Sequence, residues 1–326
     1  MSLADRRSQT AARIGQLCAG LTEAQALAKG KACVYATGSF GRGEASQYSD
    51  LDVFILGKSN REGKSQLSRL DEICVKAELI DVTRSLDIPE FSGDGQYLEH
   101  FSVNELISTL GTQHDDVTNT FTARLLLLLE SSPLVQNDVY EEVIQEVIVS
   151  YWRDYEDHKH DFMPAFFTND ILRLWRTFCV NYEARTSREP EEKKAKGKLK
   201  NYKLKHSRLL TCYSGILNLL AQYRASKSVS PTNALEMIKL TPTERLEWLI
   251  EEPSIAEAHD TLKALLHQYE LFLDETNYDE QELINRFLNR SLSKGYVDAA
   301  YKFGDLMFEA LNCIGQNNRF HRLLVV

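Results

Sequence analysis

The spacing of hydrophobic residues predicts that the chain begins with helices and short strands. Between residues 4 and 29 apolar positions recur every three or four residues, which is the period of an amphipathic helix. Residues 32–36 (ACVYA) and 51–56 (LDVFIL) are short β-favouring runs; the first ends at Thr37 and Gly38, and the second ends at Gly57. Helical spacing returns from residue 62 to about 86. The pattern therefore predicts a helix, two strands and a second helix.

A third predicted strand follows, and beyond it the periodicity of the sequence is almost entirely helical. Residues 96–101 are expected to form a strand, and Ser102 with Glu105 matches a capping box, in which each side chain satisfies the other's free backbone N–H. Beyond about residue 112 strand signals nearly vanish. Helical periodicity then fills eight segments: 118–131, 138–157, 169–184, 206–226, 232–251, 254–274, 279–293 and 296–315.

These elements predict an α+β N-terminal domain, made of a small mixed sheet with helices, followed by an all-α helical bundle. We expect residues 1–29 to form an N-terminal helix that packs on the core, residues 30–112 the α+β domain and residues 113–326 the helical domain. A length of 326 residues allows two domains of ordinary size. The 43% of hydrophobic residues is too high for a disordered chain.

Charge and cysteine content argue against several classes of protein and site. The chain has 38 Lys and Arg against 47 Asp and Glu, a net charge of −9, which argues against extensive coating of a nucleic-acid backbone. Its six cysteines include no CxxC pair, so neither a zinc site nor a disulfide framework is indicated. The longest leucine run, Leu125–Leu129, ends at Glu130. We therefore expect a cytoplasmic protein without a membrane span.

Candidate chemistry is concentrated between the first two predicted strands. A turn at Gly38 and Ser39, after a strand and before a predicted helix, offers backbone N–H groups and a hydroxyl to an anion such as a polyphosphate. Asp50 and Asp52 alternate along the next strand, so both side chains are expected on one face. Two carboxylates suit Mg²⁺ or Mn²⁺, with substrate phosphates completing the coordination. A phosphate cradle beside such a cation indicates nucleotide chemistry.

The order of these features, in the stretch GSFGRGEASQYSDLD, resembles the DNA polymerase β-like nucleotidyltransferase superfamily. The stretch looks most like the nucleotidyltransferase domain of PII-protein uridylyltransferase and its uncharacterised relatives, and the similarity covers roughly residues 30–130. The resemblance implies that residues 30–112 are a catalytic domain. It also implies transfer of a nucleoside monophosphate from a nucleoside triphosphate, such as ATP, to a protein, RNA or small-molecule acceptor, with release of pyrophosphate.

The resemblance further implies a third carboxylate, which acts as a metal ligand or as the base for the attacking hydroxyl. Glu99, Asp94 and Asp81 are the candidates. We favour Glu99, because it lies in the predicted strand just before the capping box, whereas Asp81 lies in a segment with helical spacing. Asp50, Asp52 and Glu99 are thus the predicted catalytic and metal-binding residues. The alternative is a catalytically silent protein that keeps the fold and binds a nucleotide or a partner.

Arginines and lysines supply further candidates for nucleotide binding. Arg42, expected on the first turn of a helix, either neutralises the triphosphate or forms a clamp with Glu44 or Asp50. Segment 185–208 carries ten Lys and Arg against three Glu, a net charge of +7. Its first half has loop-like composition and its second half is amphipathic. The predicted phosphate contacts of the second half are Lys200, Lys203, Lys205, His206 and Arg208.

The predicted helix 169–184 leaves a second question open. Asn169 is its expected N-cap, and Ile171, Leu174, Trp175, Phe178 and Tyr182 form its buried stripe. Asp170, Arg173 and Arg176 share the other side. They either reach into a cleft or form an exposed ladder of ion pairs.

Overall fold

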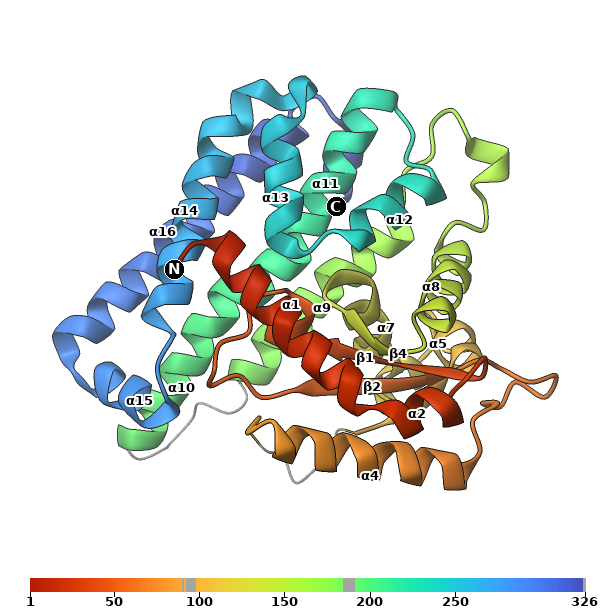
Figure 1. The fold of residues 1–326 in the computed structure, drawn as a ribbon. Helices are drawn as coiled ribbons and strands as arrows, with labels where there is room; N and C mark the ends of the chain where they lie inside the picture. Colours follow the sequence, from red (N-terminus) through yellow and green to blue (C-terminus); the bar gives the residue numbers. More distant parts are fainter. Residues whose placement is uncertain (90, 92–97, 184–190, 325–326) are drawn as a thin grey trace. The chain divides into compact units, whose positions relative to one another are not determined.

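The computed structural model describes residues 1–89, 91, 98–183 and 191–324. Its backbone forms two compact units, Met1–Arg153 and Asp154–Val326 (Figure 1). The N-terminal unit extends beyond residue 112, the expected end of the α+β domain, because its sheet takes a strand from Ser132–Val135. A helix that packs on the sheet follows this strand.

The N-terminal unit is built on a mixed four-stranded sheet with the strand order β3-β2-β1-β4. Its strands are β1 (Ala32–Thr37), β2 (Asp52–Gly57), β3 (His100–Ser102) and β4 (Ser132–Val135). β1 pairs antiparallel with β2 and with β4, and β3 runs parallel to β2. Thr37 pairs with Asp52, which places this aspartate beside the glycine-rich turn that follows β1.

Helices cover both faces of this sheet. They are α1 (Leu3–Gly20), α2 (Thr22–Leu27), α3 (Gly38–Gly41), α4 (Arg69–Ser85), α5 (Val103–Ser108), α6 (His114–Val117), α7 (Thr120–Leu129) and α8 (Asn137–Tyr151). Ile55 packs in one hydrophobic cluster with Leu79 of α4. On the opposite face the rings of Tyr35 and Phe54 stack with centroids 5.6 Å apart. Since Asp52 lies two residues before Phe54 in β2, its side chain belongs to the face opposite α4.

The structure corrects two strand predictions. The third strand is His100–Ser102 instead of 96–101, so Glu99 precedes it, and residues 96 and 97 lie outside the described part of the chain. β4 was not predicted, because its Pro133 reads as a helix terminator. Proline is tolerated there because β4 is an edge strand, where one missing N–H costs little.

Capping side chains explain where several helices begin. The capping box at Ser102 is confirmed: Ser102 Oγ accepts a hydrogen bond from the N–H of Glu105 (3.2 Å), and Glu105 Oε2 accepts one from the N–H of Ser102 (2.6 Å). Helix α4 begins at Arg69 instead of 62, because Ser68 caps it through the N–H of Asp71 (3.1 Å). The first predicted helix is two helices, α1 and α2.

The C-terminal unit is helical. Its elements are η2 (Glu156–His158), α9 (Ala165–Glu183), α10 (Glu191–Lys203), the π-helix η3 (Leu204–Arg208), α11 (Leu209–Ser226), α12 (Pro231–Lys239), α13 (Pro242–Glu251), η4 (Pro253–Ala258), α14 (His259–Glu275), α15 (Glu280–Leu288), α16 (Arg290–Gly315) and η5 (Arg319–Leu324). Helix α11 contacts α9, α13 and α16. Its sequence is apolar on nearly all sides, as a central helix requires.

Two helix boundaries in this unit differ from the predicted ones. Asn169 lies inside α9 instead of capping it, because the helix begins at Ala165, directly after Pro164. The predicted helix 232–251 is divided into α12 and α13, since Thr241 caps α13 together with Glu244. Within the described residues, no helix combines the length and the apolar composition that crossing a bilayer requires.

Candidate active site

The turn after β1 places a glycine against an aspartate. Gly38 has a φ of +63°, a conformation that residues with a Cβ adopt only with strain. A Cβ at this position would lie 3.0 Å from Oδ2 of Asp52. The structure thus brings together two of the predicted site residues, and Ser39 follows directly in the first turn of α3. N–H groups in a first helical turn have no partner within the helix.

A buried glutamate that the sequence analysis missed anchors this turn. The side chain of Glu130 is fully buried, and it accepts hydrogen bonds from the N–H of Gly38 (3.3 Å) and from Nη1 of Arg42 (2.8 Å). Its own carbonyl oxygen packs over Gly41, where a Cβ would meet it at 2.0 Å. The only signal in the sequence was a glutamate directly after five leucines.

The structure favours the clamp for Arg42. This residue is the C-cap of α3, which ends at Gly41, so it does not lie on the first turn of a helix as expected. The guanidinium is buried and forms ion pairs with Glu44 and Glu130. Buried charges of this kind are stable only when paired. Glu44, one of the two clamp partners expected from the sequence, is thus an ion-pair partner of Arg42, and Glu130 is another.

Helix α1 contributes a second arginine that sequence reasoning did not single out. Arg13 lies over the ring of Phe40, 4.7 Å from its centroid, and donates a hydrogen bond to the carbonyl oxygen of Ser46. Partial burial lowers the pKa of Arg13. These contacts fix the loop that leads from α3 to Asp50.

The two aspartates differ in their surroundings. β2 begins at Asp52, which is half-buried, whereas Asp50 is exposed in the preceding loop. Leu51 and Val53 both lie in the core cluster, so the alternation expected from the sequence holds through this segment. The structure therefore leaves Asp50 exposed before β2 and places Asp52 at the first residue of that strand.

Glu99 lies directly before β3, on the face of the sheet that Asp52 also occupies. Its carbonyl oxygen accepts a hydrogen bond from the N–H of Ile55 (3.1 Å), which extends the β2–β3 pairing by one residue. Since His100 pairs with Ile55, Glu99 is opposite Phe54, and Asp52 shares the face of Phe54. Oε2 of Glu99 also accepts a hydrogen bond from the Asn119 side chain at 3.5 Å, the upper limit of such a bond.

A buried ion pair fixes the segment that carries Asn119. The side chains of Arg124 and Asp115 are fully buried, and Nη2 of Arg124 lies 2.6 Å from Oδ2 of Asp115. Arg124 also donates to the carbonyl oxygen of Leu106 (2.7 Å) and to the hydroxyl of Tyr151 (2.9 Å). The arginine that enters a run of five leucines is thereby satisfied by partners within the fold.

The other candidates for the third carboxylate lie elsewhere or outside the described residues. Asp81 is an exposed residue of α4, on the sheet face opposite Asp52, and Asp94 falls in the undescribed segment. In the described ranges, no group of three or more His, Cys, Asp or Glu side chains is arranged to hold a metal ion. Asp50, Asp52 and Glu99 therefore do not form a closed three-residue cluster.

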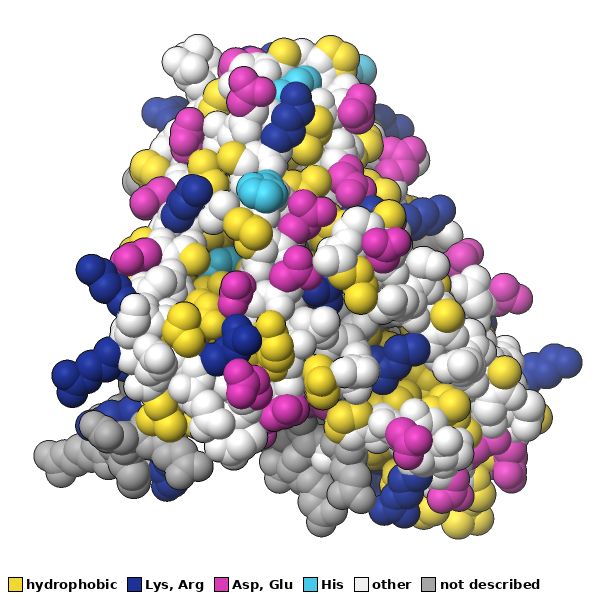
Figure 2. Space-filling model, turned by 60° about the vertical axis from the view of Figure 1, so that its left-hand side comes forward, with side chains coloured by type: hydrophobic (Ala, Val, Ile, Leu, Met, Phe, Trp, Pro, Cys, Tyr) yellow, Lys and Arg dark blue, Asp and Glu magenta, His cyan; other side chains and the backbone are white. Residues whose placement is uncertain are grey.

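The three predicted lysines belong to the C-terminal unit, where two are exposed and the third packs against an aromatic ring. Lys200 and Lys203 are exposed on α10, whereas the ammonium of Lys205 lies over the ring of Tyr301, 4.7 Å from its centroid. Lys196 of the same basic segment pairs with Glu280 (2.7 Å), and residues 185–190 lie outside the described residues. In Figure 2 the Lys and Arg side chains lie scattered among Asp and Glu side chains.

Comparison with known proteins gives one match. Residues 17–99 match the family model of the nucleotidyltransferase domain. No curated protein and no solved structure matches the chain. The matched residues include the turn at Gly38, both aspartates and Glu99, and they end before β3. With its mixed four-stranded sheet, the N-terminal part of this chain is therefore a nucleotidyltransferase domain, and a largely helical region follows it.

Proposed function

We propose that this protein is a metal-dependent nucleotidyltransferase that transfers a nucleoside monophosphate from a nucleoside triphosphate to an acceptor hydroxyl. The observation that carries the proposal is the contact between the left-handed turn at Gly38 and the carboxylate of Asp52, within the matched domain. The match is to the general domain. A closer relationship to PII-protein uridylyltransferase stays a prediction.

The donor set fits a hard divalent cation such as Mg²⁺ or Mn²⁺. Asp52 offers carboxylate oxygens beside the turn, and Asp50 lies two residues before it. Mg²⁺ commonly takes one or two carboxylates while substrate phosphates and water complete its shell. An open arrangement of this kind needs no closed cluster of three side chains before the triphosphate binds. When bound, the cation would neutralise charge on the phosphates.

In the proposed step, an acceptor oxygen forms a bond to the α-phosphorus while the bond from that phosphorus to the bridging oxygen of pyrophosphate breaks. The hydroxyl proton passes to a carboxylate, for which we propose Glu99. Ser39 and the first-turn amides of α3 hold the β- and γ-phosphates. Arg42 acts indirectly, because with Glu44 and Glu130 it fixes the turn that presents these groups.

We retain a second candidate, a protein that binds a nucleotide or a partner without catalysing transfer. One observation favours it: the three predicted carboxylates do not converge as a cluster among the described residues. In either case we propose a cytoplasmic location. All six cysteines lie in the described part of the chain and carry free thiols, as a reducing compartment would keep them.

The experiment offers each α-labelled nucleoside triphosphate, with Mg²⁺ or Mn²⁺ and a cell lysate as the source of acceptors, to the protein. We expect labelled product and pyrophosphate with wild type, and at least a hundredfold slower release with Asp52→Ala or Asp50→Ala, since metal-assisted charge stabilisation is typically worth several kcal/mol. Glu99→Gln tests the proposed base.

Asp81→Ala is the matched control, because it removes an exposed carboxylate from the opposite face of the sheet and should leave the rate unchanged. Transfer that survives in both Asp52→Ala and Asp50→Ala would sink the proposed mechanism. If wild type binds nucleotide but releases no pyrophosphate from any of the four triphosphates, the non-catalytic candidate is correct.

A further inference from the structure

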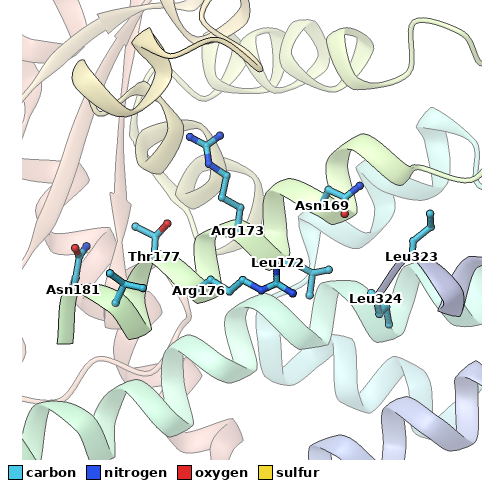
Figure 3. Close-up of a pocket in the computed structure, with 9 residues that line it drawn as sticks. Asn169, Leu172, Arg173, Arg176, Thr177, Asn181, Leu323 and Leu324 are labelled. Atoms are coloured by element: carbon cyan, nitrogen blue, oxygen red, sulfur yellow. The ribbon is translucent and has the colours of Figure 1, made fainter. Parts of the chain in front are cut away.

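A cavity of about 570 Å³ lies within the C-terminal unit, along one side of α9 (Figure 3). Arg173 and Arg176 line it, so of the two alternatives from the sequence the structure favours the cleft over the exposed ladder of ion pairs. Asp170 is buried, and its carboxylate is 3.9 Å from the guanidinium of Arg173. In Figure 3 the side chains of the two arginines point in different directions, so they do not converge on one ligand.

Three side chains do converge in the N-terminal unit, at the C-terminal end of β2. Oγ of Ser65 is 2.8 Å from Nε2 of His100, and Nδ1 of the same ring is 3.1 Å from Oε2 of Glu72. Ser65 belongs to the loop after β2, His100 begins β3 and Glu72 lies in α4. A serine, a histidine and a carboxylate linked in this order match a nucleophile, its general base and the group that orients the base.

The carboxylate of Glu72 determines which nitrogen of His100 carries the proton. Glu72 is buried, and Nζ of Lys76 is 2.6 Å from its Oε1. Burial acts to raise the pKa of Glu72, but hydrogen bonds from Lys76 and His100 outweigh it and leave this pKa below its ordinary value. An ionised carboxylate can only accept, so Nδ1 of the neutral His100 ring donates to it. Nε2 is then left to accept the hydroxyl hydrogen of Ser65.

Two features of the backbone fix the pair of Ser65 and His100. A Cβ on Gly57, the last residue of β2, would overlap Oγ of Ser65 and lie 3.1 Å from Nε2 of His100, so only glycine leaves room for them. The N–H of Leu67 donates a hydrogen bond to Oγ of Ser65 (3.1 Å). A hydroxyl oxygen has two lone pairs, so one of them remains for attack on an electrophile.

The backbone N–H of Ser65 can stabilise an oxyanion. Ser65 pairs with Ser59 in an antiparallel bridge, and the neighbouring residues on both sides form the hydrogen bonds of this bridge. The N–H of Ser65 therefore points away from Ser59, and among the described residues it donates to no acceptor. In serine hydrolases the N–H of the nucleophile is itself a donor of the oxyanion hole. Ser65 is half-buried between the exposed Lys64 and Gln66, which suits a small substrate.

We propose that Ser65, activated by His100 and oriented through Glu72, is a nucleophile that hydrolyses small carboxylic esters. Oγ of Ser65 forms a bond to the carbonyl carbon while its proton passes to Nε2 of His100. The bond from that carbon to the alcohol oxygen then breaks, and His100 returns the proton to this oxygen. Water attacks the acyl-serine in the same way, which releases the acid and restores Ser65. This activity does not rest on the function proposed above.

A fluorophosphonate, a reagent that forms a covalent bond with activated serine hydroxyls, tests the proposal on the full chain. The buffer contains EDTA and no nucleotide, so nucleotidyl transfer plays no part. With wild type we expect labelling of Ser65, located by mass spectrometry of peptides, and hydrolysis of p-nitrophenyl acetate above the rate of Ser65→Ala. Both should fall at least a hundredfold in His100→Gln, since general-base catalysis is typically worth that factor.

Further variants separate catalysis from a purely structural hydrogen-bond chain. Glu72→Gln keeps the size of the side chain but removes its charge, and should lower kcat for the ester while KM stays unchanged. Free imidazole should restore part of the labelling in His100→Ala, because it can accept the proton in place of the missing ring. Ser85→Ala, which removes a hydroxyl from the end of α4, is the matched control and should be labelled as wild type is. Unchanged thermal melting would show that each variant is folded.

The proposal is overturned if the fluorophosphonate leaves Ser65 of wild type unlabelled. It is equally overturned if His100→Gln and Glu72→Gln are labelled as fast as wild type, because the three side chains then only fasten the loop to α4 and β3. Failure of the proposed nucleotidyl transfer is observed separately, as absence of pyrophosphate release.

Discussion

Gly38 connects backbone conformation with chemistry at the scale of a single residue. Its positive φ allows the chain to turn sharply out of β1, and its missing Cβ leaves room for the carboxylate of Asp52. Glu130 holds the same turn through the N–H of Gly38 and through Arg42. One position therefore combines a conformational requirement with a steric one.

We predict that Gly38→Ala reduces the rate of pyrophosphate release strongly, because its Cβ would displace the carboxylate of Asp52. The variant should also lose about 1–2 kcal/mol of stability from the left-handed conformation. Gly30→Ala is the matched control: Gly30 has a φ of +68° but nothing within 4 Å of an added Cβ. Urea unfolding should show a similar loss in both variants, and a rate equally low in both would contradict the role of Asp52.

Element by element, the strongly periodic helices and the first two strands could be predicted from the sequence, because their spacing and turns are local signals. In the candidate site, the closeness of Gly38 and Asp52 could be predicted, because the turn and the strand that carry them are local signals. The partners from other segments, Glu130 and Arg13, were not predictable: Glu130 is 92 residues from Gly38 and Arg13 is 33 residues from Ser46, and contacts over such separations follow no local spacing in the sequence. β4 was missed because its proline signals a break.

The π-helix η3 carries His206, a buried histidine whose pKa is lowered by its surroundings. His206 is buried, its ring stacks on Phe272 (centroids 4.5 Å apart) and on Phe303 (4.9 Å), and its Nδ1 is 2.9 Å from the carbonyl oxygen of Tyr202. Burial lowers the pKa of His206 to about 4, and nearby Lys205 adds to the effect. The folded protein therefore keeps this histidine neutral.

We predict an acid-dependent loss of stability from His206. In the unfolded state the histidine has a pKa of about 6.5, whereas in the folded state the pKa of His206 is about 4. Between these two pH values only the unfolded state binds the proton, and this favours unfolding. The free energy of unfolding therefore has its full value, with respect to His206, above pH 6.5, and it falls by about 3 kcal/mol as the pH drops to 4. Urea unfolding at pH 7, 5.5 and 4.5 measures it.

His206→Phe keeps the stacked ring and should flatten this part of the pH profile. His267→Phe, which changes an exposed histidine of α14, should retain the wild-type slope. Equal slopes in the two variants would show that His206 does not contribute.

At the scale of the whole molecule, the two compact units divide the chain after Arg153. The sheet of the first unit needs residues well beyond the matched family region, because β4 pairs with β1, and Tyr140 of α8 packs beside Tyr35. A nucleotidyltransferase domain that ended at residue 112 would lack both β4 and α8. The smallest folded piece is therefore expected to include β4 and α8.

We predict that a fragment of residues 1–153 unfolds cooperatively in urea, whereas a fragment of residues 1–112 does not. The shorter fragment exposes Tyr35 and Phe54, which are almost fully buried in the intact unit. Circular dichroism during urea titration measures the difference, with residues 154–326 as a fragment of comparable length. A cooperative transition of residues 1–112 would show that the missing strand and helices are dispensable.

The two edges of the sheet have a consequence for how the protein behaves when concentrated. Exposed strand edges are templates on which other chains can add, and long flat edges aggregate. Here the edge strands are β3, with three residues, and β4, with four, of which Pro133 provides no N–H. A strand from another molecule would find too few donors and acceptors to pair stably. Pro133, because of which β4 was not predicted from the sequence, thus also helps to prevent strands of other molecules from pairing with this edge.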